Sequence, residues 1–487
     1  MSDANRVRIA LLRETTFGVL PGSARLRTLR MTGESLAYTP QFVSSNEIRS
    51  DRMNADPIKV NEQNAGGINF ELSYPNDNGP LEELVASAMF NPWIKTNSRD
   101  NDGTADSVIT DVASSGGVVT CTTGTAFVVG QLVRNTGFGQ SANNGLFRCT
   151  TGSATVPAFA SQGLVNEPAP AAAARMKVVG FQGASGDITA TATGLASTAL
   201  DFTTLGLQVG QRVRPSSNSG GGFGFATAAL SSAWARITAI AANALTLDML
   251  PAGWTTDAGS GKTIRVYVTD FVRNGTTRRS LAIERSFLDQ AVPTHILQKG
   301  MVVGQLQMAW QTEQLIAGSF DLMGLTGSQG TVANGASYDA ASTGRVMSAN
   351  VSVGRICEAG VAIASPNYVR NLQFSINNNL RQLTAVGNVG AVDIGAGENA
   401  GSGTAETYFG SNAFLTKLLN GTPSSLTAEA AIDNQAFIVT FPRVTFTQGS
   451  PSAGQKNADV LLPLQFQSSI DTLTNCHQQF DRAEYFD

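Results

Sequence analysis

The chain alternates apolar and polar positions over many short segments. The alternation is regular in 264–268, 281–287 and 460–466. A period of two residues puts successive side chains on opposite faces of a strand. The sequence therefore predicts a protein built mainly from β-strands.

Helical periodicity is limited to two short segments. Residues 78–90 carry Pro80 at a favourable first-turn position and an apolar stripe that includes Leu81 and Leu84. Residues 412–421 end at Gly421, a typical helix stop. We expect a mainly β fold with a few short helices.

Several segments recur in the same order in the two halves of the chain, which indicates an internal duplication. The matched pairs are 26–29 with 369–372, 67–72 with 403–408, Leu81 and Leu84 with Leu415 and Leu418, 281–283 with 438–440, and Leu306 with Leu464.

Residues 96–270 interrupt the first copy and show a repeat of their own. The segment 127–134 resembles 207–214, and each is followed by an arginine-containing strand and a short apolar strand. This pattern predicts two small all-β modules, 96–182 and 183–270. A loop-rich insertion of this kind usually lies on an outer surface, where it disturbs the core least.

Composition argues against an enzyme and against a duplex-binding protein. Charged residues make up 14% of the chain, against roughly 25% in an average soluble domain. The formal net charge is −4, and the chain has two histidines and four cysteines. Few side chains are therefore available for metal sites or for acid–base chemistry. The negative net charge gives no basic surface for binding nucleic acid.

The first residues lack the pattern of a secretory signal, and no apolar run reaches the roughly 20 residues of a membrane helix. We expect free thiols, although Cys121 and Cys149 lie in one segment and could approach each other.

Candidate catalytic motifs fail on spacing or context. Residues 259–263 end like a phosphate-binding loop, but Thr256 stands where that motif needs glycine, and a strand follows instead of a helix. His295 is expected in a turn and His477 in a polar tail, each without a nucleophile motif. Arg278 and Arg279 favour an exposed edge or a subunit contact. We therefore predict no catalytic residues, no metal site and no cofactor.

Two long polar connections, 38–66 and 377–397, are shaped for contacts between subunits. Connections of this length are uncommon in a compact domain unless they bind something. A merely solvated loop is the alternative. The candidates for contacts between subunits or between rings are Glu47, Arg49, Asp51, Arg52, Asn379 and Arg381. The candidates for exterior decoration within the insertion are Arg134, Arg148, Arg214 and Trp234.

Several motifs of the chain follow one another in a characteristic order, at residues 10–22, 45–52, 66–72, 81–84, 279–289 and 441–446. In order and spacing they resemble motifs of the tail tube proteins (major tail proteins) of long-tailed, non-contractile bacteriophages. The resemblance covers about two-thirds of the chain and leaves out the insertion. It implies two tail-tube domains of the β-sandwich, barrel-forming type, one from 1–95 with 271–345 and the other from 346–487.

The resemblance also implies a virion protein that stacks as rings into a hollow tube. The tube would enclose the tape-measure protein and conduct DNA, and it would meet the tail terminator and distal tail proteins. A duplicated chain implies three chains per pseudo-sixfold ring, and otherwise six chains. The implied place is the virion tail, assembled in the host cytoplasm without membrane insertion. The main alternative is a surface adhesin or fibre subunit whose small β modules bind host glycans. An unrecognised hydrolase is a third reading.

Overall fold

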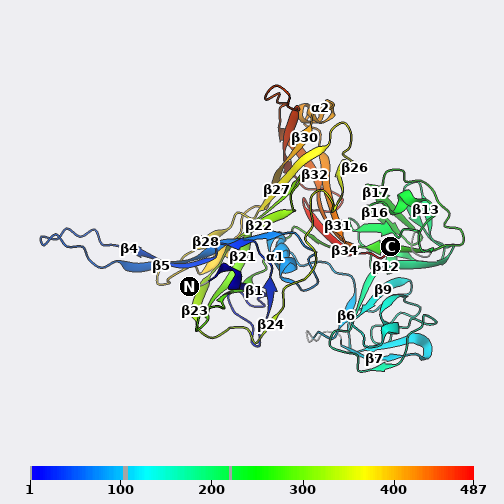
Figure 1. Cartoon of the computed structure of the whole chain (residues 1–487), viewed down its shortest axis with the longest axis horizontal. Coiled ribbons are helices and arrows are strands. Elements are labelled where there is room, and N and C mark those ends of the chain that lie inside the picture. Colours follow the sequence, from blue (N-terminus) through cyan, green and yellow to red (C-terminus); the bar gives the residue numbers. More distant parts are fainter. Residues whose placement is uncertain (1–2, 103–107, 219–221) are drawn as a thin grey trace.

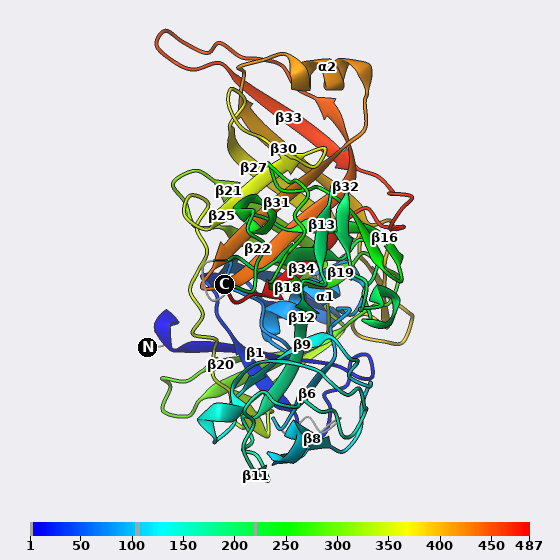
Figure 2. The ribbon, with the colours of Figure 1, turned by 90° about the vertical axis from the view of Figure 1, so that its right-hand side faces the viewer.

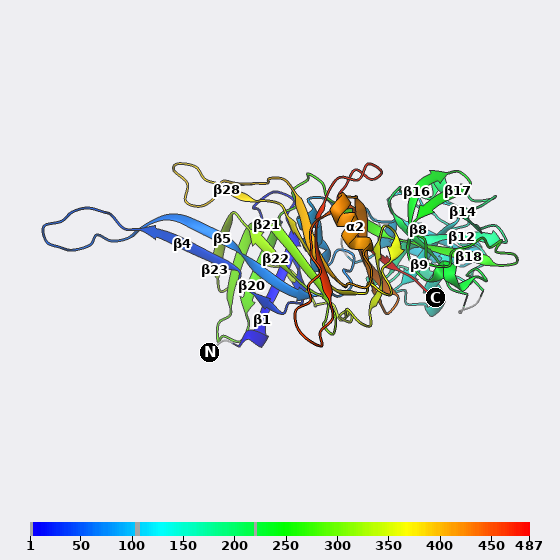
Figure 3. The same cartoon turned by 90° about the horizontal axis from the view of Figure 1, so that it is seen from above.

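The computed structural model describes residues 3–102, 108–218 and 222–487. The protein is mainly β, as the alternating pattern predicts, and its strands form a large central sheet system and a separate inserted unit (Figure 1). The long β4–β5 hairpin and the inserted unit project at opposite ends of the molecule (Figure 3).

Among the described residues, the N-terminal repeat contributes eleven strands to the central sheet system. They are β1 (Val7–Arg13), β2 (Arg25–Leu29), β3 (Gly33–Glu34), β4 (Ala37–Val43), β5 (Ile58–Glu71), β19 (Asp270–Arg273), β20 (Leu281–Phe287), β21 (Thr294–Gln311), β22 (Ala317–Met323), β23 (Thr326–Gly330) and β24 (Ser337–Asp339).

The C-terminal repeat adds a second set of strands. They are β25 (Val353–Glu358), β26 (Val361–Ala362), β27 (Val369–Asn377), β28 (Arg381–Leu383), β29 (Asp393–Gly395), β30 (Ala400–Tyr408), β31 (Ser424–Ile432), β32 (Gln435–Gln448), β33 (Leu461–Ser468) and β34 (Gln479–Glu484). Strands β28 and β29 form a two-stranded hairpin of their own.

The inserted segment holds its own strands and most of the 3-10 turns. The strands are β6 (Ser98–Asp100), β7 (Ile109–Ala113), β8 (Val118–Cys121), β9 (Gln131–Thr136), β10 (Gly145–Arg148), β11 (Glu167–Pro168), β12 (Arg175–Ser185), β13 (Thr189–Thr191), β14 (Gly194–Ala196), β15 (Arg212–Pro215), β16 (Ala235–Ala241), β17 (Ala244–Asp248) and β18 (Thr263–Val268). The 3-10 turns of the chain are η1 (Ala4–Arg6), η2 (Ser115–Gly117), η3 (Ser141–Asn143), η4 (Phe202–Thr204) and η5 (Ala228–Ser231).

The two predicted helices are confirmed. Helix α1 (Pro80–Met89) begins after Gly79, has Pro80 at its first position and buries Leu81 and Leu84 in the main core. Helix α2 (Ala413–Asn420) ends at Gly421, which adopts φ 60°. Both helices follow the strand at the same place in their repeats, β5 and β30, and α1 packs chiefly against β21.

The duplication is visible in the strand pairing, but the sequence matched part of the first repeat to the wrong strand of the second repeat. Strands β1–β20–β21–β22–β5 are joined in the same order as β25–β31–β32–β33–β30. Strand β20 therefore corresponds to β31, whereas the sequence matched 281–283 to a part of β32. A two-residue alternation is the same in every strand, so it cannot distinguish neighbouring strands.

The repeat predicted inside the insertion is visible as a backbone turn that occurs once in each module. Gly130 and Gly210 both adopt positive φ, 92° and 89°, which glycine tolerates without strain. In the first module, Val128 N donates to Gln131 Oε1 over 2.9 Å, and in the second, Gln208 N donates to Gln211 Oε1 over 3.0 Å. Strand β12 pairs with β9 over residues 175–181 and with β18 over residues 180–185, so one sheet runs through both modules. Figure 2 faces this unit, with β13 and β16 above β6 and β8.

A buried charge cluster fixes the insertion to the central sheet system. Arg482 on β34 is fully buried and donates to Glu82 Oε2 of α1 over 2.9 Å, and it also contacts Asp77. Asp270, where the chain returns from the insertion, accepts from Lys177 Nζ over 2.5 Å and also pairs with Arg482. Burial alone raises the pKa of Asp270, but Lys177 and Arg482 outweigh it and hold that pKa well below its usual range.

We expect Asp270→Asn to lower the free energy of unfolding by about 3 kcal/mol, because it leaves buried cations without their counter-charge. The matched control is Asp248→Asn, whose carboxylate pairs with Arg236 but is 38% exposed, and which should cost less than about 1 kcal/mol. Denaturant unfolding of the monomer measures both. A lowered folded-state pKa stabilises above the unfolded value of about 3.9, so the effect of Asp270→Asn should shrink as pH falls. Equal losses in the two variants would contradict the prediction.

Candidate assembly surfaces

The central feature is an unbroken run of paired strands that crosses both repeats. Its order is β4–β5–β22–β21–β27–β30–β33–β32. Strand β3 also pairs with β5, at residues further along β5 than those that pair with β4. The repeats meet where Gln305–Gln311 of β21 pair antiparallel with Asn371–Asn377 of β27. One chain therefore makes a single curved wall out of two copies of the same unit.

One face of this wall is polar and almost uncharged. Residues directly opposite one another on neighbouring strands point to the same face. One such row reads Asn69, Ser319, Gln307, Ser375, Ser402, Gln467 and Thr445. The next row reads Glu71, Ala317, Ala309, Gln373, Thr404, Gln465 and Gln448. Glu71 is the charged member of the two rows.

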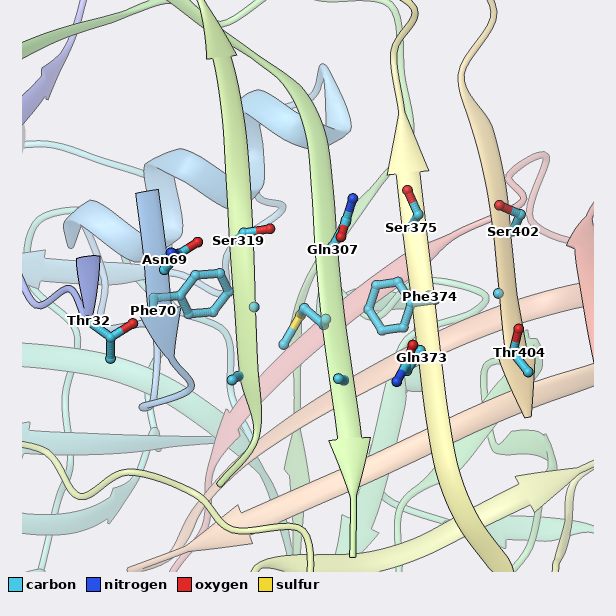
Figure 4. A pocket seen from close by; sticks show the side chains of 15 residues that line it. Thr32, Asn69, Phe70, Gln307, Ser319, Gln373, Phe374, Ser375, Ser402 and Thr404 are labelled. Carbon is cyan, nitrogen blue, oxygen red and sulfur yellow. The ribbon is translucent and has the colours of Figure 1, made fainter. Parts of the chain in front are cut away.

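Part of this polar face is a hollow of about 510 Å³ (Figure 4). The labelled side chains of Ser319, Gln307, Ser375 and Ser402 follow one another across four strands in that view. Charges elsewhere on this face include Asp321, opposite Gln305, and Glu406, opposite Asn371. Glu406 pairs with Arg370 Nη1 at 3.7 Å, so the face near the hollow offers amide and hydroxyl groups with little net charge.

The opposite face of the same strands is the apolar core. Phe70 stacks on Phe320 with ring centroids 4.8 Å apart, and Phe374 meets Phe441 edge-on at 5.1 Å. Leu464 and further buried side chains of both repeats belong to the same cluster as helix α1. Burial of this face fixes which side chains remain on the polar face.

The predicted arm candidates of the first connection lie on the β4–β5 hairpin, which extends far from the body (Figures 1 and 3). Glu47, Arg49, Asp51 and Arg52 are all exposed near its end. Arg49 Nη2 pairs with Asp51 Oδ2 at 2.5 Å, and this guanidinium lowers the pKa of the Asp51 carboxyl.

The same hairpin carries exposed apolar side chains. They are Phe42, Val43, Ile48, Met53, Ile58 and Val60. A run of apolar side chains on a thin hairpin cannot be buried by the hairpin itself, and such exposure is typical of a surface that another molecule covers.

The arm candidates of the second connection lie at the shorter β28–β29 hairpin. Asn379 adopts φ 47° and donates to Glu398 O over 2.8 Å, and Arg381 begins β28 opposite Gly395. A Cβ at Gly390, near the end of this hairpin, would lie 3.7 Å from Glu62 of β5. The structure therefore places the end of the second predicted arm against β5 at the base of the first.

The exterior candidates of the insertion lie at its junctions. Arg134 stacks over the Phe486 ring at 4.6 Å, and Arg214 pairs with Asp487 at 2.6 Å. Trp234 is buried against Tyr485, and Arg148 donates to Gln182 O over 2.9 Å. Three of the four thus contact residues 485–487 of the same chain.

Side chains that could take part in catalysis or binding are paired or buried within the chain. His295 is buried on β21 beside Ser286, so the expectation of a turn is wrong. Arg279 pairs with Glu83 and Arg278 with Asp393, so both have partners within the chain. The loop that resembles a phosphate site leads into β18, and the cysteines Cys121, Cys149, Cys357 and Cys476 are free and buried. Over the described residues, no group of His, Cys, Asp and Glu is arranged to hold a metal ion.

Sequence reasoning missed the polar face and the Arg482 cluster. The face has a sequence signal, since β21, β27 and β33 carry Gln, Asn or Ser at alternate positions, as in Gln305, Gln307, Gln373 and Ser375. Which alternate positions face away from the core becomes clear only from the pairing.

The comparison with known protein families decides the identity. The profile of the phage tail tube protein family matches residues 4–238 and, a second time, residues 204–468. The chain belongs to the phage tail tube protein family. The resemblance and the duplication inferred from the sequence are thereby confirmed.

Membership makes this tail tube protein a structural component of the phage tail that assembles with copies of itself into a tube. No curated protein matches the chain. In the described part of this tail tube protein, no helix has the length and apolar character needed to cross a membrane.

We expect the polar face to contribute little to the stability of the tail tube monomer. Gln373→Ala should change the free energy of unfolding by less than about 0.5 kcal/mol, because the side chain is exposed. Its neighbour Phe374 points into the core, and Phe374→Ala should cost about 3–5 kcal/mol. Denaturant unfolding measures both, and a cost above about 1 kcal/mol for Gln373→Ala would count against the assignment of faces.

Proposed function

We propose that this tail tube protein polymerises as stacked rings with the polar face of the β4-to-β32 wall turned toward the lumen. The observation that carries the proposal is the pair of polar rows that crosses seven strands and both repeats without a cation. Amide and hydroxyl groups hold a layer of water, and two rows without a cation give DNA phosphates little to bind. Such a wall suits a channel that first encloses the tape-measure protein and later conducts DNA.

The ring contains three chains in this proposal. Each chain supplies two equivalent wall segments, so three chains supply six and give pseudo-sixfold symmetry. The alternative is a ring of six chains. The β4–β5 hairpin, with its exposed apolar and charged residues 47–52, is the contact to the adjacent ring.

The insertion decorates the outside of the tube. Two observations support this: it lies at the end of the molecule opposite the β4–β5 hairpin (Figure 3), and its Lys177 pairs with Asp77 and Asp270 of the Arg482 cluster. We divide the chain into tail-tube domains 1–95 with 271–345 and 346–487, and inserted modules 96–182 and 183–270. The glycan-binding alternative gains no support from Trp234, which is buried, or from Phe223, which lies under Arg265.

The remaining parts of the proposal concern the setting. The protein has no catalytic site and uses no cofactor. It is assembled in the host cytoplasm, and the ends of the tube meet the tail terminator and the distal tail proteins.

Negative-stain microscopy of the recombinant full-length protein tests the assembly. We expect hollow tubes, and removal of residues 97–269 should leave tubes of smaller diameter. The deletion is feasible because Thr96 already donates to Asp270 Oδ1 over 2.8 Å, so the two ends lie side by side. A matched control replaces the segment with a short Gly/Ser linker. Unchanged diameter would refute the exterior position, and monomers under every nucleating condition would refute the tube.

Charge added to the polar face tests the lumen. Ser375→Lys with Ser402→Lys places two adjacent cations in the row without touching the core. We expect tubes of normal shape but phage titres lower by about tenfold or more, because lysines bind passing phosphates. The control is Thr123→Lys with Thr155→Lys on exposed sites of the insertion. Equal titres in the two double variants would refute the lumen assignment.

A further inference from the structure

The two repeats share their irregularities, which fixes their alignment residue by residue. In the β20–β21 hairpin the register shifts between Leu281 and Ile283, and in the β31–β32 hairpin it shifts between Ser424 and Leu426. The partners across these shifts are Met301 in β21 and Val444 in β32. Met301 therefore corresponds to Val444.

A second irregularity gives the same alignment. Strands β21 and β22 shift register between Val303 and Gln305, and β32 and β33 shift between Phe446 and Gln448. Gln305 therefore corresponds to Gln448. The isolated bridge between Ser452 and Leu461 then corresponds to the pair Ala309 and Ala317.

The inner strands follow from the same alignment. Since Asp321 pairs with Gly67 and Gln465 pairs with Thr404, Gly67 corresponds to Thr404. The partner of β5 is then the equivalent of β27: the pair Ala37–Ala65 matches Ser375–Ser402, and Gly33–Asn69 matches Asn371–Glu406. The segment 33–39 is therefore the first-repeat counterpart of 371–377. The sequence match of Gly67 to Gly403 is wrong by one residue.

In this alignment, one strand pairing is present in the middle of the wall, but its counterpart at the ends of the wall is missing. In the middle of the wall, β27 occupies the outer edge of β21. At the end of the wall, the corresponding edge, 448–454, has no strand beside it among the described residues, and 33–39 pairs with β5 alone. One chain thus carries both halves of a second junction at opposite ends of its wall.

We propose that residues 33–39 of one chain pair antiparallel with residues 448–454 of a second copy, in the register of the β27–β21 junction. This inference rests on the proposed ring assembly and specifies its contact. Transferred from the internal junction, the register puts Thr39 opposite Gln448, Ala37 opposite Ser450, Ser35 opposite Ser452 and Gly33 opposite Gly454.

The backbone groups of the two segments are compatible even at Pro451, the position where a regular strand pairing would lose a donor. Pro451 has no N–H to donate, and this register places it opposite Leu36. The groups of Leu36 point away from β5, because Ser35 N donates to Gly67 O of β5 over 2.9 Å. Both have partners within the chain: Leu36 O accepts from Arg285 Nη1 over 2.6 Å, and Leu36 N donates to Glu34 Oε2 over 2.8 Å. The missing N–H of Pro451 therefore leaves no group of Leu36 unsatisfied, and the interchain hydrogen bonds come from the residues on either side.

The side chains and the space also fit. Ala37, Ser35, Ser450 and Ser452 are small and would continue the polar rows across the junction without a charge. Beside Arg30–Glu34, a groove of about 900 Å³ between that segment and residues 4–8 leaves room for the residues after Gly454. Because each chain offers one edge of each kind, the contact is head-to-tail and closes into a ring.

Engineered cysteines test the register in assembled tubes. Ala37→Cys with Ser450→Cys in one chain places the two thiols directly opposite each other, within the distance that a disulfide spans. Mild oxidation should give a ladder of covalent species that ends at three chains. A second in-register variant, Ser35→Cys with Ser452→Cys, covers the case in which the first fails to fold.

Two controls make the outcome specific. Ala37→Cys with Ser452→Cys is shifted by two residues and should crosslink about tenfold less, because the Cα atoms are then too far apart. Gln307→Cys with Ser375→Cys marks the internal junction and should give an intrachain bond even in monomers. The native cysteines are buried, so the unmodified protein should stay uncrosslinked.

The results separate this inference from the ring assembly itself. Tubes that form without crosslinks in both in-register variants, or with equal crosslinking in the shifted control, would overturn the register and leave the tube intact. Failure of the unmodified protein to form any tube would overturn the proposed assembly and this contact with it. A ladder that ends at six chains would keep the register and change the ring size.

Discussion

The pairing of β21 with β27 is the contact on which the architecture depends. A strand edge is a row of backbone donors and acceptors that must find partners when it is buried. Here the edge of the first repeat is satisfied by the second repeat of the same chain over Gln305–Gln311 and Asn371–Asn377. That pairing turns two similar units into one wall and leaves a strand edge at each of its two ends, 33–39 and 448–454.

The chemistry of the wall follows from its single core. Both repeats bury the same face of their strands, with Phe70, Phe320 and Phe374 in one continuous cluster. The outward face is therefore free to take whatever side chains the assembled tube requires. In this chain those are glutamine, asparagine, serine and threonine, and they do not contribute to the core.

The insertion shows a different way of joining units. Its modules repeat one glycine turn, in which Gln131 Nε2 donates to Leu205 O and Gln211 Nε2 donates to Thr269 O. Gln131 thus links the first module to the second, and Gln211 holds the end of the second module, where the chain returns to the central sheets. At the central sheets the link becomes ionic, through Arg482 and Asp270, which are buried deeply enough that neither charge is tolerable without the other. An insertion held in this way moves with the tail-tube body.

The sequence by itself determined the β class, the helices at Pro80–Met89 and Ala413–Asn420, the duplication and the family. These depend on local periodicity, on capping residues and on the order of motifs, all of which are properties of short segments. Only the tertiary structure decided which face of each strand is buried and which strands of the two repeats correspond. It also showed that Arg134, Arg214 and Trp234 hold residues 485–487. The reason is that a two-residue alternation reads the same after a shift of one strand, whereas long-range pairing and its bulges admit a single register.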